Sequence, residues 1–545
     1  MSNKPTDLEF FKATVSDPDT LTWDEAMAEG PENVAKWLEA ADKEIKALEG
    51  KEAWNERALS DATVKVIPGT WVFRRKRSPA REISKWKARW VLRGDLQEVN
   101  FDTYAAVVAW STVRIFLVMS LLLACTTKTL DFDNAFIQAK LDHECWAYLP
   151  RGYYSMMSLK HGDKACLRLN KSVYGLKVAP KLWFEHLKRG WVELGFKSSS
   201  YDECLLYREG MLLVVFVDDC GLAVSDPSMI DWFVNELRKR GFELQVEGDF
   251  TAFLGVALDR LPDGSIHLHQ SGLIKKIIVA AKMEDANPNW LPATATLGSD
   301  PDGEPYTQHP WKYSTIVGML IYLATNTRPD ISFATSQVAR YSKSPRQSHA
   351  TAVKTIIRYL KRTSDKGTII TFSGALDMID YVDADFAGLF GKEPPRNPDS
   401  ARSRAGFVIL LGGMPLFWKS ALMTAICLST LEAEYQALSL SMKYVIAYKL
   451  LIDELVEVLK LDDLKTTIST KVYEDNQGAL YLATNQRLTN RTKYFHVKWH
   501  HFWWYVQTEQ VSVEKVDTKL QAADYLTKHL PRELFENCRK IVQGW

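Results

Sequence analysis

The order of apolar and polar positions divides the chain into segments of helical and strand periodicity. Between residues 20 and 58, apolar side chains recur at helical spacing beside an acidic face, as in "NVAKWLEAADKEIKALEGKEAW". From residue 63 to 92 the pattern changes to strands, in "TVKVIPGTWVFRRKR" and "SKWKARWVLRG". A helix is predicted over about residues 112–127, and it leads into "KTLDFDNAFIQAKL". This mixture predicts an α+β architecture rather than an all-helical one.

A β-hairpin is predicted in "CLLYREGMLLVVFVDDCGLAV", after a helix in "APKLWFEHLKRGWVELGF". Two apolar runs flank the turn formed by Arg208, Glu209 and Gly210. The second run ends in the adjacent Asp218 and Asp219, where mutual repulsion and loss of solvent both oppose two negative charges. Either these residues form a solvated turn, or a positive group lies against them.

The second half of the chain repeats the mixed pattern after an irregular stretch. Residues 284–310 concentrate Pro, Gly and Asp, which is typical of a linker, and helices follow to about Arg362. From Gly367 onwards the strand candidates are "TIITFSG", "DMIDYVDADFAG", "AGFVILLGG" and "TKVYEDNQGAL". The longest apolar run, residues 115–125, is too short to span a bilayer and predicts a buried helix. The first residues lack the pattern of a secretory signal.

Composition limits the class of protein but does not identify its function. A chain of 545 residues with 46% hydrophobic and 25% charged residues predicts two to four folded domains. The net charge of +1 means that any binding of nucleic acid depends on local basic patches. Seven scattered cysteines without a CxxC pair argue against a disulfide framework and a zinc site, and favour a reducing compartment.

A third aspartate changes the interpretation of the hairpin. Asp131, in "TLDFDNAF", also follows an apolar approach and lies 87 residues (218 − 131) before Asp218. If the two segments are neighbouring strands of one sheet, three carboxylates converge at one end of it. Divalent cations are the natural counter-charge, and oxygen ligands favour Mg²⁺, or Mn²⁺ in its place. Two such ions about 3.5–4 Å apart serve phosphoryl transfer.

Several blocks in a fixed order resemble the reverse transcriptases of copia-type LTR retrotransposons. They run from near Trp37 to about Lys528 and are "KWKARWVLRG", "DFDNAF", "PRGYY", "KSVYGLKVAP", "FVDD", "FLGVAL", "YSTIVGMLIYLATNTRPDISFA" and "IIRYLKRT". The resemblance identifies the chain as a fragment of a Pol polyprotein with a C-terminal ribonuclease H. It implies a right-hand polymerase with fingers, palm and thumb, the palm being a ferredoxin-like split βαβ, followed by an α/β ribonuclease H-like domain.

The resemblance also implies domain limits. Residues 1–60 are expected to form an N-terminal helical extension and residues 61–290 the fingers, palm and thumb. Residues 291–372 are expected to form a linker and connection helices, and residues 373–545 the ribonuclease H-like domain.

Carried over residue by residue, the resemblance assigns roles at the first carboxylate site. Asp131, Asp218 and Asp219 would hold two metal ions, and Phe136 would exclude a 2′-hydroxyl by shape, although on its own it would be taken as a core aromatic residue. Lys87 and Arg89 would contact the triphosphate of a deoxynucleotide, with Tyr174 and Lys177 also near the nucleotide. The surrounding basic strands alternate with aromatic residues, which favours contact with phosphates and bases. Those aromatic residues are Trp71, Phe73, Trp86 and Trp90.

A second set of acids follows in the order of a ribonuclease H, in "DYVDADFAG", "LSTLEAEYQAL", "VYEDNQGAL" and "LQAADYLTK". The resemblance assigns the two metal ions of this site to Asp383, Glu434, Asp475 and Asp524. Glu432 lies on a different helical face from Glu434 and is expected to be exposed. The histidines of "YFHVKWHHFWWYV" are expected to pack among aromatic residues rather than bind metal. They are His496, His500 and His501.

Departures from the family pattern leave two functions open. The loop "GDLQEVNFDTYAAVV" is about three residues shorter than usual and has Ala106 where Pro is common. Arg404 and Ala405 replace the usual Thr and Ser, and "HHFWWYVQTEQV" replaces a segment that usually ends in Ile-Arg-Glu. No protease, zinc-module or zinc-knuckle motif is present. The leading hypothesis is an RNA-directed DNA polymerase with a ribonuclease for RNA–DNA hybrids. The alternative is an impaired or host-adopted relic that binds nucleic acid without chemistry.

The expected partners and location follow from the leading hypothesis. They are an RNA template, a DNA primer, the RNA–DNA hybrid and deoxynucleoside triphosphates, with integrase or capsid proteins of the same element as further candidates and no membrane. The expected location is the cytoplasm, within a virus-like particle, and the nucleus.

Overall fold

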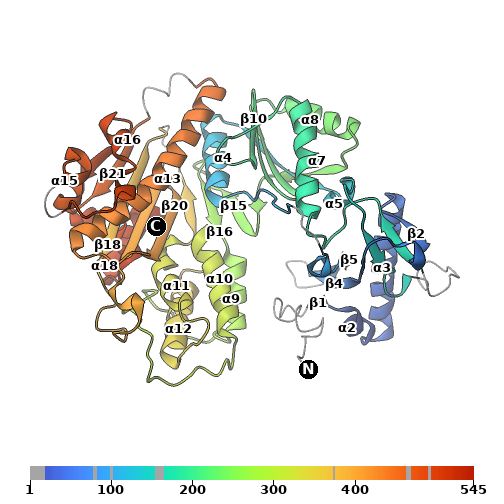
Figure 1. Cartoon of the computed structure of the whole chain (residues 1–545), viewed down its shortest axis with the longest axis horizontal. Coiled ribbons are helices and arrows are strands. Elements are labelled where there is room, and N and C mark those ends of the chain that lie inside the picture. The colour runs from blue at the N-terminus through green and yellow to red at the C-terminus, as the bar shows by residue number, and fades with distance from the viewer. Residues whose placement is uncertain are drawn as a thin grey trace.

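The computed structural model describes residues 19–77, 83–98, 102–153, 165–371, 375–461, 468–488 and 492–545. The early elements and the sheet that holds β10 lie on the right of Figure 1, and the C-terminal elements lie on the left. A group of helices, α9 to α12, lies below and between them. Among the described residues, no helix combines the length and apolar character that crossing a membrane requires. Short 3₁₀ turns are η1 (Leu59–Asp61), η2 (Gly94–Leu96), η3 (Pro329–Ile331), η4 (Pro398–Ala401), η5 (Val497–His500) and η6 (Thr518–Leu520).

The N-terminal layer is a three-stranded sheet covered by two helices. Its strands, in order, are β1 (Thr20–Leu21), β4 (Gly69–Arg77) and β5 (Ile83–Leu92), and its helices are α2 (Trp23–Met27) and α3 (Pro31–Gly50). Trp37, Ala41, Ile45 and Leu48 form the buried stripe of α3, at the three- and four-residue spacing expected for an amphipathic helix. Helix α2 begins with a capping box between Thr22 and Glu25.

The predicted helical region to residue 58 is wrong at its end, because Trp54–Ala58 forms strand β2. This strand pairs antiparallel with β8, more than a hundred residues later. The full sheet has the order β2, β8 (Ala165–Leu169), β7 (Trp146–Tyr148) and β3 (Val66–Ile67). A five-residue segment with a charged sequence gives no local strand signal, so the distant partner decides its conformation.

The central layer is a six-stranded sheet in which all neighbours are antiparallel. Its order is β13 (Leu244–Asp249), β6 (Thr126–Phe132), β12 (Asp219–Val224), β11 (Met211–Phe216), β10 (Leu205–Arg208) and β9 (Lys197–Ser198). The predicted hairpin is confirmed as β10 and β11, joined at Glu209 and Gly210. The predicted helix over residues 112–127 is α4 (Trp110–Leu122), which ends five residues early, because β6 begins at Thr126.

Side-chain alternation gives this sheet two different faces. One face, with Leu206, Leu213 and Leu222, packs against α7 (Ala179–Glu193) and α8 (Ser228–Lys239). The other face, with Leu205 and Val214, packs against α4. The short helix α5 (Ala135–Gln138) follows β6 and lies near α7. Two helices therefore cover one face of an antiparallel sheet, and one helix covers the other.

A small antiparallel sheet joins the middle of the chain to the helical group. Its order is β14 (Ala252–Phe253), β15 (Val256–Arg260), β16 (Ile266–His269) and β17 (Thr368–Ile370). The helices are α9 (Ser271–Ala280), α10 (Tyr313–Asn326), α11 (Ser332–Ala339) and α12 (Gln347–Arg362). Strand β17 was predicted to begin the second α/β unit, but it pairs with β16 instead. The sequence shows that a segment favours a strand, not which sheet it joins.

The C-terminal layer is a mixed five-stranded sheet. Its order is β20 (Met414–Leu422), β19 (Arg404–Leu411), β18 (Met378–Asp385), β21 (Thr470–Glu474) and β22 (Ser512–Lys515), with the first three antiparallel and the last two parallel to β18. The strand predicted in "TKVYEDNQGAL" ends at Glu474, because Asn476 caps the next helix. The helices are α13 (Thr430–Val458), α15 (Gln477–Asn485), α16 (Trp503–Gln507), α17 (Asp524–Thr527) and α18 (Arg532–Gln543).

The central and C-terminal layers share one apolar core. Side chains of α4, of the central sheet and of β19 with α13 belong to the same buried cluster. At its edge the fully buried Arg114 of α4 donates to the carbonyl oxygens of Leu416 (2.9 Å) and Asn326 (2.6 Å). Glu454 of α13 accepts from Tyr207 of β10 (2.9 Å). These contacts hold the two layers side by side, as Figure 1 shows.

A buried ion pair anchors the helical group. The Arg328 guanidinium donates to both carboxylate oxygens of Asp330, at 2.9 and 2.7 Å, and to the Thr363 carbonyl oxygen at 3.0 Å. The Tyr359 hydroxyl donates to Asp330 at 2.6 Å. Neither charged side chain is exposed to solvent. Every donor and acceptor is needed, because a charge left without its partner in this interior is costly.

We expect Arg328→Met to lower the free energy of unfolding by about 3–5 kcal/mol, because Asp330 then keeps a buried charge without its counter-ion. The matched control is Lys188→Met, which removes an exposed ion pair with Glu203 and should cost at most about 1 kcal/mol. Urea unfolding of both variants measures the difference. Equal losses in the two variants would contradict this account of the anchor.

Candidate functional site

The first group of acids lies where strands β6 and β12 meet. Asp131 and Asp219 are direct cross-strand partners, and Asp218 is in the turn between β11 and β12. Leu130, Phe132 and Cys220 point into the core beneath α7 and α8, so the alternating Asp131 and Asp219 lie on the opposite face. The predicted convergence of these three residues on neighbouring strands is confirmed.

The turn that carries Asp218 has a defined conformation. Val217 adopts a left-handed backbone with φ of 56°, which a β-branched residue rarely takes. The indole of Trp183 on α7 donates to the Val217 carbonyl oxygen at 2.6 Å. The Phe132 amide donates to the backbone carbonyl oxygen of Asp218 at 3.3 Å. Packing from two elements therefore imposes this turn, and local strain of this kind is found at functional sites.

The acids of this site oppose one another's ionisation. Burial, and then the negative charges of Asp218 and Asp131, raise the pKa of Asp219 to about 6. Burial and the neighbouring acids also raise the pKa of Asp131. Two contributors to these shifts were not predicted, Glu247 on β13 and Asp133 after β6. Gln245 pairs with Asp131 across the strands, and Glu247 lies two positions further along β13. If this pairing had been known, Glu247 would have been predicted to lie near Asp131.

Cationic groups on strand β5 and two aromatic rings, those of Phe136 on α5 and of Tyr174, lie near these acids. Lys87 on β5 is close enough to lower the pKa of Asp131, while burial and then Arg89 lower the pKa of Lys87 itself. The Arg89 guanidinium lies 4.1 Å from the centre of the Tyr174 ring. The rings of Phe136 and Tyr174 meet edge to face, with 5.0 Å between their centres. Burial raises the pKa of Tyr174 to about 12, and Asp218 and Asp131 contribute to that shift.

Two glycines allow the segment around Tyr174 to dock on strand β5. The Leu92 amide donates to the Tyr174 carbonyl oxygen at 2.8 Å. Gly175 has φ of 92°, and a Cβ at this residue would collide with the Leu92 carbonyl oxygen. A Cβ on Gly94 would collide with the Gly175 carbonyl oxygen. Lys177 is exposed, and its ammonium donates to the Gln97 carbonyl oxygen at 3.0 Å. The five predicted nucleotide residues therefore lie in one region, with Lys177 at its periphery.

Three of the four aromatic residues between the basic ones are buried and cannot stack on bases, so the prediction is wrong for them. They are Trp71, Phe73 and Trp90, whereas Trp86 is half-buried and packs against the same core under α3. Alternation along two paired strands puts the aromatic residues on the inner face. Arg75 shows the structural role of one of the basic residues, because it pairs with Glu29 and lies over the Trp86 ring.

The second group of acids lies at one edge of the C-terminal sheet, on β18, on α13 and just after β21. Carboxylate oxygens of Asp383, Glu434 and Asp475 lie within 4.8 Å of one another. Asp524, at the start of α17, joins them through Lys528, whose ammonium lies 2.9 Å from Asp524 and 3.6 Å from Asp383. The Thr527 hydroxyl donates to Asp383. Four acids separated by up to 141 residues (524 − 383) are thus brought together.

Burial makes this second site strongly unfavourable for bare negative charge. It raises the pKa of Glu434 to about 10, with Asp383 as the next contributor. Burial and then Asp383 raise the pKa of Asp524 to about 6. Burial raises the pKa of Asp383 as well, while Lys528 and Thr527 oppose that shift. The group can therefore hold a proton or a cation where these side chains meet.

Both groups fit divalent cations by their own chemistry. Their donors are carboxylate oxygens alone, which hard cations such as Mg²⁺ prefer. In the second group, Oε2 of Glu434 is buried and has no hydrogen-bond partner among the residues that the structure describes. A buried oxygen facing two other carboxylates is a natural ligand for a cation.

Two further predictions concern residues near the second group of acids, Glu432 and the histidines after α15. Glu432 was expected to be exposed, but it is 4% exposed, and that prediction is wrong. It lies in the first turn of α13, where its carboxylate accepts the Leu428 amide at 2.7 Å and a negative charge suits the helix N-terminus. Of the three histidines expected to pack among aromatic residues, His500 does so, with Nδ1 2.8 Å from the Tyr435 hydroxyl and its ring centre 4.2 Å from that of Trp503. His496 and His501 are exposed, so the expected burial is wrong for them.

A buried acid of strand β18 lies outside both groups. Asp380 on β18 is fully buried, and the Ser441 hydroxyl of α13 donates to its Oδ2. Its Oδ1 has no hydrogen-bond partner in the described part of the chain. Burial raises the pKa of Asp380 well above its usual value. Burial therefore favours the protonated form of this carboxyl group in the folded protein.

We expect Asp380→Asn to change how stability depends on pH. In the unfolded chain the carboxyl ionises above about pH 4, so folding takes up one proton. The wild type should therefore lose about 1.4 kcal/mol of stability per pH unit relative to the variant, from about pH 4 up to the folded pKa. Urea unfolding of both proteins without divalent ions at pH 5, 6 and 7 measures the difference. A difference that does not change with pH would show that Asp380 folds in its charged form.

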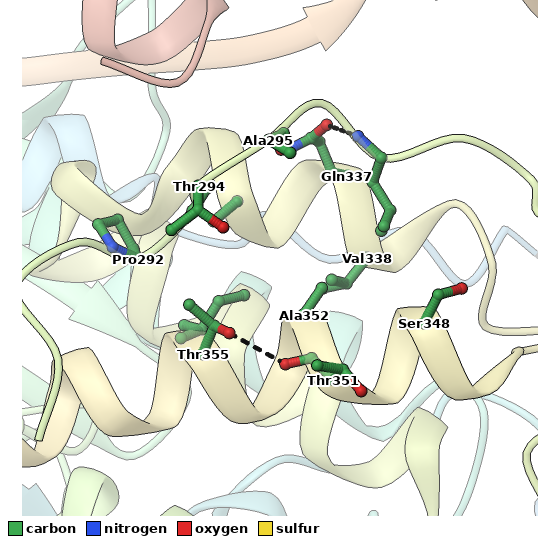
Figure 2. Close-up of a pocket in the computed structure, with 13 residues that line it drawn as sticks. Pro292, Thr294, Ala295, Gln337, Val338, Ser348, Thr351, Ala352 and Thr355 are labelled. Atoms are coloured by element: carbon green, nitrogen blue, oxygen red, sulfur yellow. Dashed lines mark hydrogen bonds between the residues drawn. The ribbon is translucent and has the colours of Figure 1, made fainter. Parts of the chain in front are cut away.

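A cavity of about 180 Å³ lies elsewhere, between residues 292–297 and helices α11 and α12 (Figure 2). Gln337 lines the cavity, and its side-chain oxygen accepts a hydrogen bond from the Leu297 amide at 2.6 Å. Among the described residues that line it, none has a titratable side chain. These lining residues therefore offer no group for acid–base chemistry.

Comparison with known proteins identifies relatives of this chain. Residues 53–295 match the family described as reverse transcriptase (RNA-dependent DNA polymerase). The retrovirus-related Pol polyprotein from transposon RE2 of Arabidopsis thaliana is 30% identical over 514 residues, which is 93% of this chain and 34% of the relative. That from transposon TNT 1-94 of Nicotiana tabacum is 30% identical over 87% of this chain and 35% of the relative. The putative transposon Ty5-1 protein of Saccharomyces cerevisiae is 29% identical over 56% of this chain and 97% of the relative.

These matches confirm the resemblance to copia-type Pol polyproteins that the sequence motifs indicated. The chain spans about a third of the length of the Arabidopsis and Nicotiana polyproteins.

Proposed function

We propose that the protein is an RNA-directed DNA polymerase that also cleaves the RNA of RNA–DNA hybrids. Its residues 53–295 match the reverse transcriptase family, and most of the chain is similar to copia-type retrotransposon Pol polyproteins. The observation that carries the proposal is the meeting of Asp131, Asp218 and Asp219 on paired strands, with Lys87 and Arg89 nearby.

The fold supports a right-hand arrangement. An antiparallel sheet with two helices on one face, as in β6 to β13 with α7 and α8, suits a split βαβ palm. The basic strands β4 and β5 would be fingers, and residues after β13 would include the thumb. The five-stranded mixed sheet with α13 suits a ribonuclease H-like unit. On this basis, we assign residues 61–290 to the polymerase, 291–372 to the linker and connection, and 373–545 to the nuclease.

At the polymerase centre, Asp131, Asp218 and Asp219 would hold two Mg²⁺ ions, or Mn²⁺ in their place. Bound there, such ions activate an attacking oxygen and stabilise a leaving one in phosphoryl transfer. The three side chains themselves fix where that chemistry occurs, because strand pairing sets the position of Asp131 relative to Asp219 and the Trp183 contact sets the turn. Their mutual repulsion favours cation binding over ionised, empty carboxylates.

The neighbouring residues would bind the incoming deoxynucleotide. Lys87 supplies a point charge and Arg89 a planar fork for the triphosphate oxygens. The Tyr174 ring packs against the Arg89 guanidinium and makes an edge-to-face contact with the Phe136 ring. Phe136 is half-buried near Asp131, so its ring can reject a 2′-hydroxyl by shape. Lys177 would add positive charge at the rim.

At the nuclease centre, Asp383, Glu434, Asp475 and Asp524 would hold a second pair of Mg²⁺ ions. Lys528 and Thr527 orient Asp383, and Lys528 also fixes Asp524. The substrate would be the RNA strand of the hybrid that the polymerase produces, recognised by its shape and 2′-hydroxyls.

The position of Lys87 and Arg89 bears on the alternative of an inactive relic. A displacement of these residues by the shortened loop after β5 would favour the relic. Lys87 lies within electrostatic reach of Asp131, and Arg89 lies against the Tyr174 ring, whose own pKa is raised by Asp218 and Asp131. Close packing at Gly94 and Gly175 holds the end of β5 against the Tyr174 segment. The arrangement therefore supports an active enzyme over a relic that only binds nucleic acid.

The proposal implies specific partners and surroundings. The polymerase would need an RNA template, a DNA primer and deoxynucleoside triphosphates, and integrase or capsid proteins of the same element would accompany it. We propose that it acts in the cytoplasm, within a virus-like particle, with a further nuclear location.

The experiment is extension of a labelled DNA primer on an RNA template by the full chain with Mg²⁺. We expect stepwise extension with deoxynucleotides. Failure to extend under Mg²⁺ or Mn²⁺, together with retained binding of the primer–template, would favour the relic.

A further inference from the structure

A third group of ligand side chains lies on the hairpin formed by β15 and β16, apart from both carboxylate groups. Its members are Asp259, His267 and His269, whose ligand atoms all lie within 4.8 Å of one another. In the part of the chain that the structure describes, it is the one such group that contains histidine. We propose that this hairpin binds one zinc ion.

Strand geometry explains why these three side chains share one face. His267 and His269 are two positions apart on β16, so both point away from the core, into which the buried Leu268 points. Asp259 is the direct cross-strand partner of His267. A His-x-His pair with one cross-strand carboxylate thus forms a three-ligand set on a rigid hairpin.

The second ring nitrogen of His269 already has an oxygen partner. Nδ1 lies 2.8 Å from the Ser271 hydroxyl, at the first residue of α9, and Nε2 lies 2.8 Å from the Asp259 carboxylate. Histidines that bind metal usually donate their other ring N–H to an oxygen, which fixes the tautomer and the ring orientation. The Ser271 amide also lies 3.5 Å from Nδ1. When the ion takes Nε2, Nδ1 carries the proton and the Ser271 hydroxyl accepts from it.

The spacing of the ligand atoms suits a small ion after a slight adjustment. Zinc binds His nitrogen and carboxylate oxygen at about 2.0–2.2 Å, so tetrahedral ligand atoms lie about 3.3–3.5 Å apart. The 2.8 Å contact between His269 and Asp259 would open by about half an ångström, with the ion in place of the shared proton. Asp259 is exposed and both histidines are partly exposed, so a water molecule can take the fourth position.

The donor set distinguishes this site from the two carboxylate groups. Imidazole ligands favour zinc over Mg²⁺, whereas oxygen-only sites favour Mg²⁺. The surrounding charges do not oppose a cation: Lys366 lies near His267 but is paired with Asp365 at 3.2 Å. The ion would connect β15 to β16 and orient His269 at the start of α9. The scattered cysteines gave no indication of zinc, because this site needs none.

The test is a zinc titration of the metal-free full chain against a chromogenic chelator, with millimolar Mg²⁺ present to occupy the carboxylate groups. We expect one equivalent of Zn²⁺ to bind tightly to the wild type and this phase to be lost in His267→Gln/His269→Gln. His496→Gln is the matched control, since that histidine is exposed on a different segment, and it should bind as the wild type does. Equal tight binding by the double variant and the wild type would overturn the proposal.

Two further variants separate metal binding from folding. Asp259→Asn keeps the shape of an exposed side chain and should also lose the tight phase, while its circular dichroism stays unchanged. Ser271→Ala keeps all three ligands but removes the partner of Nδ1, so we expect zinc affinity to fall about 10–100-fold. Wild-type affinity in Asp259→Asn would contradict the proposed ligand set.

Discussion

Asp218→Asn should lower RNA-templated primer extension at least about 1,000-fold, which corresponds to about 4 kcal/mol of activation free energy. The substitution preserves shape but removes a negative charge from the group formed with Asp131 and Asp219. A neutral amide is a weaker ligand for a hard divalent cation, and the remaining carboxylates cannot hold two ions in the same way. The measurement is the single-turnover rate of extension with saturating Mg²⁺.

The matched control for this prediction is Asp226→Asn. Asp226 is an exposed turn residue just beyond the other end of β12, and it accepts the Ser228 amide. The control should extend the primer at nearly the wild-type rate. Asp218 is half-buried, so its variant should keep its fold and its affinity for the primer–template. Extension by Asp218→Asn at more than about a tenth of the control rate would contradict a metal-binding role.

Asp475→Asn should abolish cleavage of the RNA strand in an RNA–DNA hybrid while leaving primer extension intact. Asp475 contributes one of the three carboxylates that lie within 4.8 Å of one another, and it is less buried than Asp383 or Glu434. Its replacement removes ligand charge with little loss of packing. We expect a fall of at least about 1,000-fold in cleavage rate, as for the first site.

Asp453→Asn is the control for the nuclease. Asp453 lies on α13, the helix that carries Glu434, but it forms an i,i+4 pair with Lys449 and is half-exposed. This variant should cleave and extend normally. If Asp475→Asn also stopped extension, the two carboxylate groups would not be independent centres, and the assignment of one activity to each would be wrong.

The sequence predicted individual acids better than the surfaces around them. Asp131, Asp218 and Asp219 were predictable because each follows an apolar strand, and the convergence needed only the assumption that the strands are neighbours. Glu247 was missed because β13 joins β6 from more than a hundred residues away, and no local pattern records that pairing. The aromatic residues of β4 and β5 were misinterpreted because α3 covers them.

Element limits were least predictable where a distant partner decides them. Trp54–Ala58 reads as the end of a helix, yet β8 converts it to a strand. Residues 368–370 join β16 rather than the C-terminal sheet. Asp259, His267 and His269 form a group only through the hairpin register, since eight positions separate Asp259 from His267 along the chain.

The most direct test of two cooperating centres is a single reaction in which the DNA primer and the RNA template carry different labels. The wild-type chain with Mg²⁺ and deoxynucleotides should lengthen the DNA strand and shorten the RNA strand of the same molecules. Asp218→Asn should leave the primer unextended, and Asp475→Asn should give extended DNA on intact RNA. If the wild type binds the primer–template but changes neither strand, the account is contradicted.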